Sequence, residues 1–93
     1  MDTSWDPQKA RTNGARHRIA FEDAEVVLTD PFGLVREDPD ALGEPRFVAV
    51  GADAPERIVT VVYAYHGDEV RLISARPATR KETDAYAKGI RLY

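Results

Sequence analysis

The chain has 93 residues, 43% of them hydrophobic and 31% charged, and a formal net charge of −3, which favours a single folded domain over residues 1–93. The absence of cysteine excludes a disulfide scaffold, a thiolate zinc site and a cysteine nucleophile. No apolar run reaches the ~20 residues of a membrane helix and the first residues are acidic, so we expect a cytoplasmic protein without a signal peptide or membrane contact.

The first predicted element is a helix over residues 7–17. The Asp-Pro pair at its start is typical of a helix N-terminus, because aspartate caps free N–H groups and proline fits the first helical position. Lys9, Asn13 and either Arg16 or His17 follow at spacings that share one helix face. The sequence therefore predicts a polar helix with a basic face.

A short amphipathic helix is predicted over residues 21–28. It must end before Pro31, because proline cannot continue a helix. Turn-forming residues dominate residues 36–45, which predicts an exposed loop.

Hydrophobic alternation predicts three antiparallel strands over residues 46–51, 57–65 and 69–76, and residues 33–35 can add a fourth at the edge. The second of these strands is apolar on both faces, so we expect it to be covered on both sides. Strict alternation in the last strand places Val70, Leu72, Ser74 and Arg76 on one face and Arg71, Ile73 and Ala75 on the other.

The segment from Thr79 to Glu82 fits a capping box and predicts a final helix that runs to about Lys88 and ends at Gly89. The predicted architecture is α+β: an antiparallel sheet of three to four strands, two N-terminal helices and one C-terminal helix, with the helices on one face.

Charge is distributed unevenly along the chain. Residues 1–20 and 70–93 are net basic, whereas residues 21–69 carry twelve acids against three arginines. Basic ends could form one positive face for a polyanion if they meet in space, or they could be solvated helix faces. Within the last basic segment, Arg76 ends a strand and Arg80 begins a helix, an arrangement that suits a phosphate. The alternative for Arg76 is an ion pair with one of the many acids.

No standard enzyme signature is present, and two histidines without cysteine make a zinc site improbable. His17 could transfer protons near neutral pH, or it could be an exposed histidine at a helix end. Tyr86 could be a phenol in a site or a core aromatic residue.

Two segments resemble known signatures. The first is Trp5-Asp6-x-x-Lys9-Ala10-x-x-Asn13-x-x-Arg16-His17, followed by Phe21-Glu22-x-Ala24; the second is Arg71-x-Ile73-Ser74-Ala75-Arg76-x-Ala78-x-x-x-Glu82-x-x-x-Tyr86. Together they resemble the BrnT-type toxins, small proteins similar to the RelE group of α+β ribonucleases. The resemblance covers about residues 4–88. It departs from the family at Arg18, where the family has a glycine that ends the helix, and at Ala20, where it has serine or threonine.

The resemblance implies a metal-independent endoribonuclease that cleaves RNA by 2′-hydroxyl attack and stalls translation. It implies no cofactor. The implied partner is a BrnA-type antitoxin with a ribbon-helix-helix domain, and the complex binds operator DNA through that antitoxin. We assign the implied roles as follows: phosphate stabilisation by Arg76 with Arg71 or Arg80 assisting, proton transfer and backbone binding by His17 and Lys9, positioning by Tyr86, and RNA binding by Arg16.

Two other functions are compatible with the sequence. The chain could be a catalytically inactive subunit that binds the antitoxin and modulates operon repression, which the net charge of −3 favours. A stand-alone binder of small ligands is the weaker alternative, because no large apolar pocket is evident. The nuclease interpretation requires that Lys9 and His17 lie on the same side of the molecule as Arg76.

Overall fold

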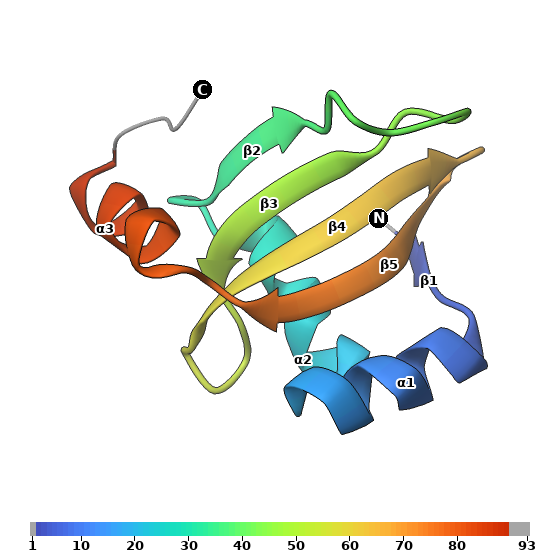
Figure 1. The fold of residues 1–93 in the computed structure, drawn as a ribbon, viewed down its shortest axis with the longest axis horizontal. Coiled ribbons are helices and arrows are strands. Elements are labelled where there is room, and N and C mark those ends of the chain that lie inside the picture. The colour runs from blue at the N-terminus through green and yellow to red at the C-terminus, as the bar shows by residue number, and fades with distance from the viewer. Residues whose placement is uncertain (1, 90–93) are drawn as a thin grey trace.

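The structure, a computed structural model, describes residues 2–89. Within these residues five strands form one mixed sheet in the order β1-β5-β4-β3-β2 (Figure 1). The elements in chain order are β1 (Asp2–Ser4), α1 (Pro7–His17), α2 (Phe21–Ala24), the 3₁₀ helix η1 (Glu25–Thr29), β2 (Leu34–Glu37), β3 (Phe47–Ala52), β4 (Ile58–His66), β5 (Glu69–Pro77) and α3 (Arg80–Lys88). The predicted α+β class is confirmed, and no helix in the described range is long and apolar enough to cross a membrane.

The two edge strands correct the predicted sheet. β1 pairs in parallel with β5, so the sheet is mixed and five-stranded rather than antiparallel with three or four strands. Its three polar residues lack apolar alternation, which is why the sequence gives no strand signal there. β2 begins at Leu34 and continues through Arg36 and Glu37, which pair with β3 although the turn formers around them predict a loop.

The main core lies between one face of the sheet and the segment α2–η1, which lies behind the sheet in Figure 1. Phe21 and Val27 of this segment are 0% and 2% exposed. With Ala24 of the same segment, they pack against buried residues of three strands and of the α1–α2 connection: Ile19, Ala49, Val59, Val61, Tyr63, Val70, Leu72 and Ala75. This burial is the principal source of stability for a domain of this size.

The opposite face of the sheet is covered in part by α3, so the prediction that all helices share one face is wrong. Thr60 alternates with the core residues of β4, is fully buried, and donates a hydrogen bond of 3.0 Å to Glu82 of α3. Val50 of β3 is also fully buried, although it lies outside the main core. Because β3 and β4 carry buried residues on both faces, cover is needed on both sides, as the sequence of β4 predicts.

A β-bulge in β5 changes which side chains face the core. Tyr63 pairs with Leu72 and Val62 pairs with Ser74, which leaves Ile73 as an extra residue on β5. After the bulge, Ala75 joins Leu72 in the core, contrary to the strict alternation predicted from the sequence. Ile73 and Ser74 turn instead toward a groove beside α1.

The starts of α1 and α3 follow the predicted signals. Asp6 accepts a hydrogen bond of 2.8 Å from the backbone N–H of Gln8 at the start of α1, and the capping box of α3 is complete. Arg18 ends α1 in the left-handed conformation, with φ 58°. The predicted helix over residues 21–28 divides into α2 and η1, because the β-branched pair Val26-Val27 disfavours a continuous α-helix.

Candidate functional site

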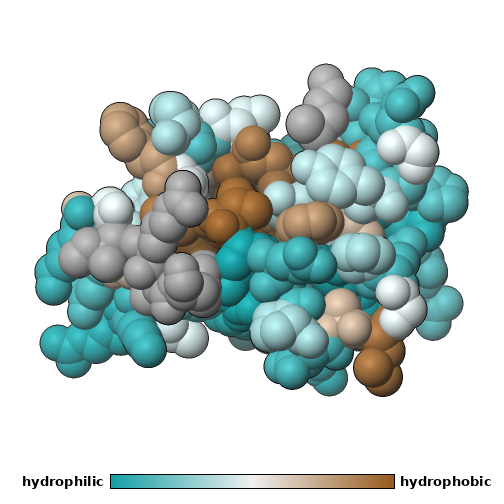
Figure 2. Space-filling view, turned by 90° about the horizontal axis from the view of Figure 1, so that it is seen from above, coloured by the Kyte–Doolittle hydropathy of each residue, from teal (hydrophilic) through white to brown (hydrophobic). Residues whose placement is uncertain are grey.

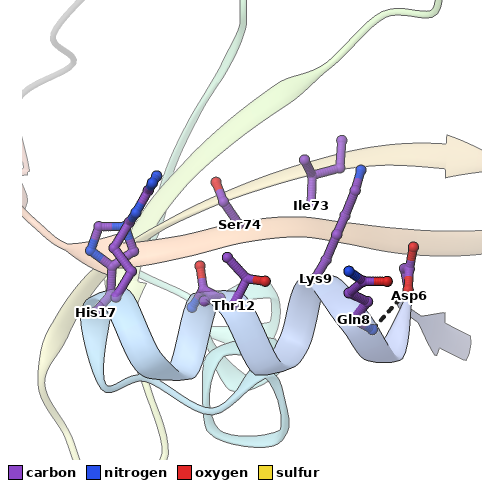
Figure 3. Close-up of a pocket in the computed structure, with 9 residues that line it drawn as sticks. Asp6, Gln8, Lys9, Thr12, His17, Ile73 and Ser74 are labelled. Atoms are coloured by element: carbon purple, nitrogen blue, oxygen red, sulfur yellow. Dashed lines mark hydrogen bonds between the residues drawn. The ribbon is translucent and has the colours of Figure 1, made fainter.

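A groove of about 450 Å³ runs between α1 and β5. Figure 3 shows the side chains of Lys9 and Thr12 rising from the helix on the same side as Ile73 and Ser74 from the strand, with His17 at the far end. The full lining consists of Asp6, Gln8, Lys9, Thr12, Asn13, Arg16, His17, Ile73 and Ser74. The basic helix face predicted from the sequence therefore forms one wall of a groove.

A second hollow of about 380 Å³ continues the groove toward the start of α1. The two hollows share Asp6 and Lys9, and the second adds Arg71 and the side chains of Ser4 and Trp5. We call the combined hollow the α1–β5 groove. It brings together four of the predicted site residues, Lys9, Arg16, His17 and Arg71.

Asn13 holds the two walls of the groove together. β1 pairs with β5 only as far as Arg71, so the outer edge of β5 beyond that point lies against α1. The Asn13 side chain is buried there: its Oδ1 accepts from the backbone N–H of Ala75 at 2.9 Å, and its Nδ2 donates to the carbonyl of Ile19 at 3.1 Å. Buried backbone groups require a hydrogen-bond partner, and Asn13 supplies the partner that a neighbouring strand would otherwise give to the N–H of Ala75.

The α1–β5 groove is electrostatically positive although the chain is acidic. Lys9, Arg16 and Arg71 line it, and within residues 2–89 none of the three forms an ion pair with a carboxylate. The one acid in the lining, Asp6, is engaged in capping α1. Cations that are not matched by neighbouring carboxylates are available to an anionic ligand.

Arg76 lies beside this groove but does not line it. It is two residues beyond Ser74 on β5, and its Nη1 and Nη2 donate to the two carboxylate oxygens of Glu82 at 2.7 and 3.1 Å. Glu82 also accepts from Thr60 and from the backbone N–H of Thr79. The sequence left open whether Arg76 serves a phosphate or an acid, and in this structure it is paired with an acid.

The environment of Glu82 stabilises its charged form. Burial alone raises the pKa of Glu82, but the hydrogen bonds from Arg76, Thr79 and Thr60, together with the charge of Arg76, outweigh burial and lower the pKa to about 2. Glu82 is therefore ionised at neutral pH and holds Arg76 against the start of α3.

Tyr86 and Arg80, both on α3, do not line the α1–β5 groove. The hydroxyl of Tyr86 donates to Oδ2 of Asp30 at 2.5 Å. This hydrogen bond, with burial and the charge of Asp30, raises the pKa of Tyr86 to about 12. Arg80 is the first residue of α3 and is exposed. The structure thus separates these two residues from Lys9 and His17.

Sequence reasoning did not select Thr12 and Ser74, which both place hydroxyl groups in the groove. Thr12 lies three residues after Lys9 on α1, a spacing that indicates a shared helix side. Ser74 gave no such signal, because its direction depends on the bulge at Ile73. No group of three or more histidine and carboxylate side chains that could hold a metal gathers in the part of the chain that the structure describes.

Comparisons with known proteins find similarity over the part of the chain that contains the groove. Residues 5–82 match a family model described as "Ribonuclease toxin, BrnT, of type II toxin-antitoxin system". The crystal structure of the Brucella abortus ribonuclease toxin BrnT is similar, with a TM-score of 0.64 and 28% sequence identity over 86% of this chain and 99% of that chain. No curated protein matches the sequence. The family match includes every residue that lines the groove between α1 and β5, apart from Ser4 in its second hollow.

Proposed function

The chain belongs to the BrnT family of ribonuclease toxins of type II toxin-antitoxin systems, and from that premise we propose that it cleaves RNA in the α1–β5 groove. The proposed reaction is a metal-independent endoribonucleolytic cleavage that arrests translation. The proposed inhibitor is a ribbon-helix-helix antitoxin, through which the complex binds operator DNA.

The observation that carries this proposal is the convergence of basic residues on one groove. Lys9 and Arg16 come from α1 and Arg71 comes from β5, so cations line both walls. A single RNA strand lying between the walls would meet a cation on either side. Such contacts to phosphates supply most of the affinity of proteins that bind nucleic acid without base readout.

The reaction needs a base for the 2′-hydroxyl, charge stabilisation for the phosphate and an acid for the leaving 5′-oxygen. His17 is the group in the groove suited to proton transfer near neutral pH. Along the helix axis, at 1.5 Å per residue, Arg16 lies about 1.5 Å from His17 and Lys9 lies about 12 Å from it, both toward the start of α1. The side chain of Lys9 must therefore extend along the groove to contact the same phosphate. We assign abstraction of the 2′-hydroxyl proton to His17 and phosphate binding to the three cations, and the leaving 5′-oxygen takes its proton from water.

Arg76 remains a proposed contributor to phosphate stabilisation from the rim of the groove. It follows Ser74 by two residues on β5, about 6.6 Å along the strand. The carboxylate of Glu82 balances the charge of Arg76. We therefore propose that Lys9 and Arg71 bind the substrate first and that Arg76 stabilises the phosphate only once the substrate is bound. We propose no chemical role for Arg80 or for Tyr86, whose phenol stays protonated at neutral pH because its pKa is raised to about 12 and whose hydroxyl donates to Asp30.

One observation favours a second function. The Arg76–Glu82 ion pair neutralises the arginine that the family resemblance assigns to phosphate stabilisation. If that pair persists with RNA bound, Arg76 contributes no charge to the phosphate, which favours an inactive subunit that binds the antitoxin and modulates repression.

A cleavage assay separates the two functions. Purified chain is incubated with 5′-labelled single-stranded RNA in the presence of EDTA, and the products are examined for a 2′,3′-cyclic phosphate. Cleavage with that end group supports the nuclease, and His17→Ala should slow it about 100-fold. Arg11→Ala is the matched control, since it removes a cation of α1 that does not line the groove. Absence of cleavage, together with normal growth on expression, would favour the inactive subunit.

A further inference from the structure

We propose that a second surface, on the other side of β1 from the α1–β5 groove, binds a basic amphipathic segment of the antitoxin. We call it the acidic surface and define it by Asp2, Glu25, Val26, Leu28 and Glu69, which line a hollow of about 580 Å³. This inference rests on the proposed function, because it takes the antitoxin as the partner.

The acidic surface combines an apolar floor with a rim of carboxylates. Val26 is 38% exposed, and Leu28 continues the floor into a neighbouring hollow lined by Val35 and Tyr65, each of which is 54% exposed. Figure 2 looks onto the β2 edge of the sheet, opposite β1, and shows hydrophobic residues gathered near the middle of that face with hydrophilic residues around them. An apolar floor of this kind fits the apolar side of an amphipathic segment.

Like charges are paired in the rim of the acidic surface. Asp2 of β1 is the direct pairing partner of Glu69 of β5, so two like charges lie side by side on adjacent strands. Glu25 joins them from η1, where the hydroxyl of Thr3 donates to its carboxylate. A lysine or arginine placed among the three would offset their charge, which is the charge complementarity that the proposal requires.

The sign of the charge selects the class of partner. Phosphate groups of RNA and anionic lipid headgroups are repelled by three carboxylates. A second copy of this chain would bring the same acids face to face, which is also unfavourable. A polypeptide with alternating basic and apolar residues satisfies both the rim and the floor.

The position of the acidic surface suggests how its occupant inhibits the nuclease. Asp2 and Thr3 line the acidic surface, whereas Ser4 and Trp5 line the α1–β5 groove, so the two hollows are separated only by β1. A partner anchored on the acidic surface can continue across β1 and cover Lys9 and Arg71. Inhibition then follows from anchoring next to the groove.

The test measures antitoxin binding and RNA cleavage on the same variants. Glu25→Lys/Glu69→Lys reverses the rim, and Asp40→Lys/Glu44→Lys, in the exposed loop between β2 and β3, makes the same change in net charge elsewhere. The binding probe is the purified protein encoded by the reading frame adjacent to that of this chain. We expect the rim variant to bind it about 100-fold more weakly and the loop variant to bind within about threefold of the unmodified chain.

RNA cleavage provides the readout that distinguishes the possible failures. Retained cleavage by the rim variant shows that it is folded, and its resistance to the antitoxin is the expected result. Equal antitoxin binding by the rim and loop variants would overturn the inference while leaving the proposed function intact. If the unmodified chain does not cleave RNA, the proposed function is overturned instead. Val26→Asp, which leaves the rim charges in place, tests the apolar floor separately and should also weaken binding.

Discussion

Asn13 carries the residue-scale contacts on which the α1–β5 groove depends. Its side chain is one of the few buried polar groups in the described chain, and it satisfies a backbone donor on β5 and a backbone acceptor after α1. A polar residue in the interior of a helix is usually exposed or unfavourable. On β5 it replaces one hydrogen bond that a neighbouring strand would otherwise provide.

Removing this side chain should destabilise the fold more than its size suggests. For Asn13→Ala we expect a loss of about 2 kcal/mol in the free energy of unfolding, because the N–H of Ala75 and the carbonyl of Ile19 lose their partner. Urea denaturation measures the change. Thr12→Ala, at an exposed neighbouring position, should stay within about 0.5 kcal/mol of the unmodified chain. Equal effects of the two substitutions would contradict the role of Asn13.

Glu82 is the second residue whose environment makes a quantitative prediction. Its pKa falls from 4.5 to about 2 in the folded chain, so its contribution to stability is present above pH 4.5 and is lost as the pH falls toward 2. The pKa of Asp30 is also lowered, by its hydrogen bonds and against the effect of burial, and it adds to the same loss.

We therefore expect Glu82→Gln to reduce the decrease in the free energy of unfolding between pH 4.5 and about pH 2. The pH-dependent part that disappears should be about 2 kcal/mol, since the 38% exposed side chain of Arg76 lets water screen part of the interaction. Thermal or urea unfolding between pH 2 and 6 measures it. Glu22→Gln, at an exposed acid of α2, is the control and should leave the profile unchanged. A profile for Glu82→Gln that matches the control would rule out this account.

At the scale of elements, the backbone conformation at the end of α1 has an energetic cost. Arg18 adopts φ 58°, a left-handed conformation that glycine adopts freely and that costs other residues about 1 kcal/mol. The backbone position is held from outside, because the carbonyl of Arg18 accepts from Arg57 at 3.4 Å. The geometry typical of a C-terminal glycine is thus kept without the glycine.

Substituting glycine at this position should stabilise the chain. We expect Arg18→Gly to raise the free energy of unfolding by about 1 kcal/mol. Arg18→Ala is the matched control, because it removes the same charge but keeps a Cβ, and it should not stabilise. Calorimetry on both variants measures their free energies of unfolding. If the glycine variant is no more stable than the alanine variant, the left-handed conformation at this position does not destabilise the chain.

The elements also show where sequence reasoning succeeds and where it fails. Local signals are read correctly at the start of α1 and at both ends of α3, since each depends on residues only a few positions apart. β1 and the bulge at Ile73 give no such signal, because both depend on pairing between distant segments. The positions of Lys9, Arg16 and His17 follow from helix periodicity, but Ser74 and the pairing of Arg76 with Glu82 required the tertiary structure.

At the scale of the whole molecule, the fold converts charge blocks along the chain into separate surfaces. The basic first segment and the start of the last basic segment meet in the α1–β5 groove. Acids from the central segment gather on η1 and at the start of β5 to form the acidic surface. The net charge of −3 therefore says little about what either surface binds.

This separation predicts that nucleic-acid binding depends on a few local cations. A 2′-O-methyl RNA, which cannot be cleaved by 2′-hydroxyl attack, allows binding to be measured as a function of salt. Each phosphate contact contributes about −0.7 to the slope of log K against log salt for a single strand. Lys9→Ala and Arg16→Ala should each make the slope shallower by about that amount.

Arg11→Ala tests whether this effect belongs to the groove or to the overall charge. Arg11 lies on α1 between Lys9 and Arg16 but does not line the groove, and its removal changes the net charge equally. If binding is local, its slope stays at that of the unmodified chain. If all three variants shift the slope alike, RNA responds to the total charge of the protein, and the α1–β5 groove is not where it binds.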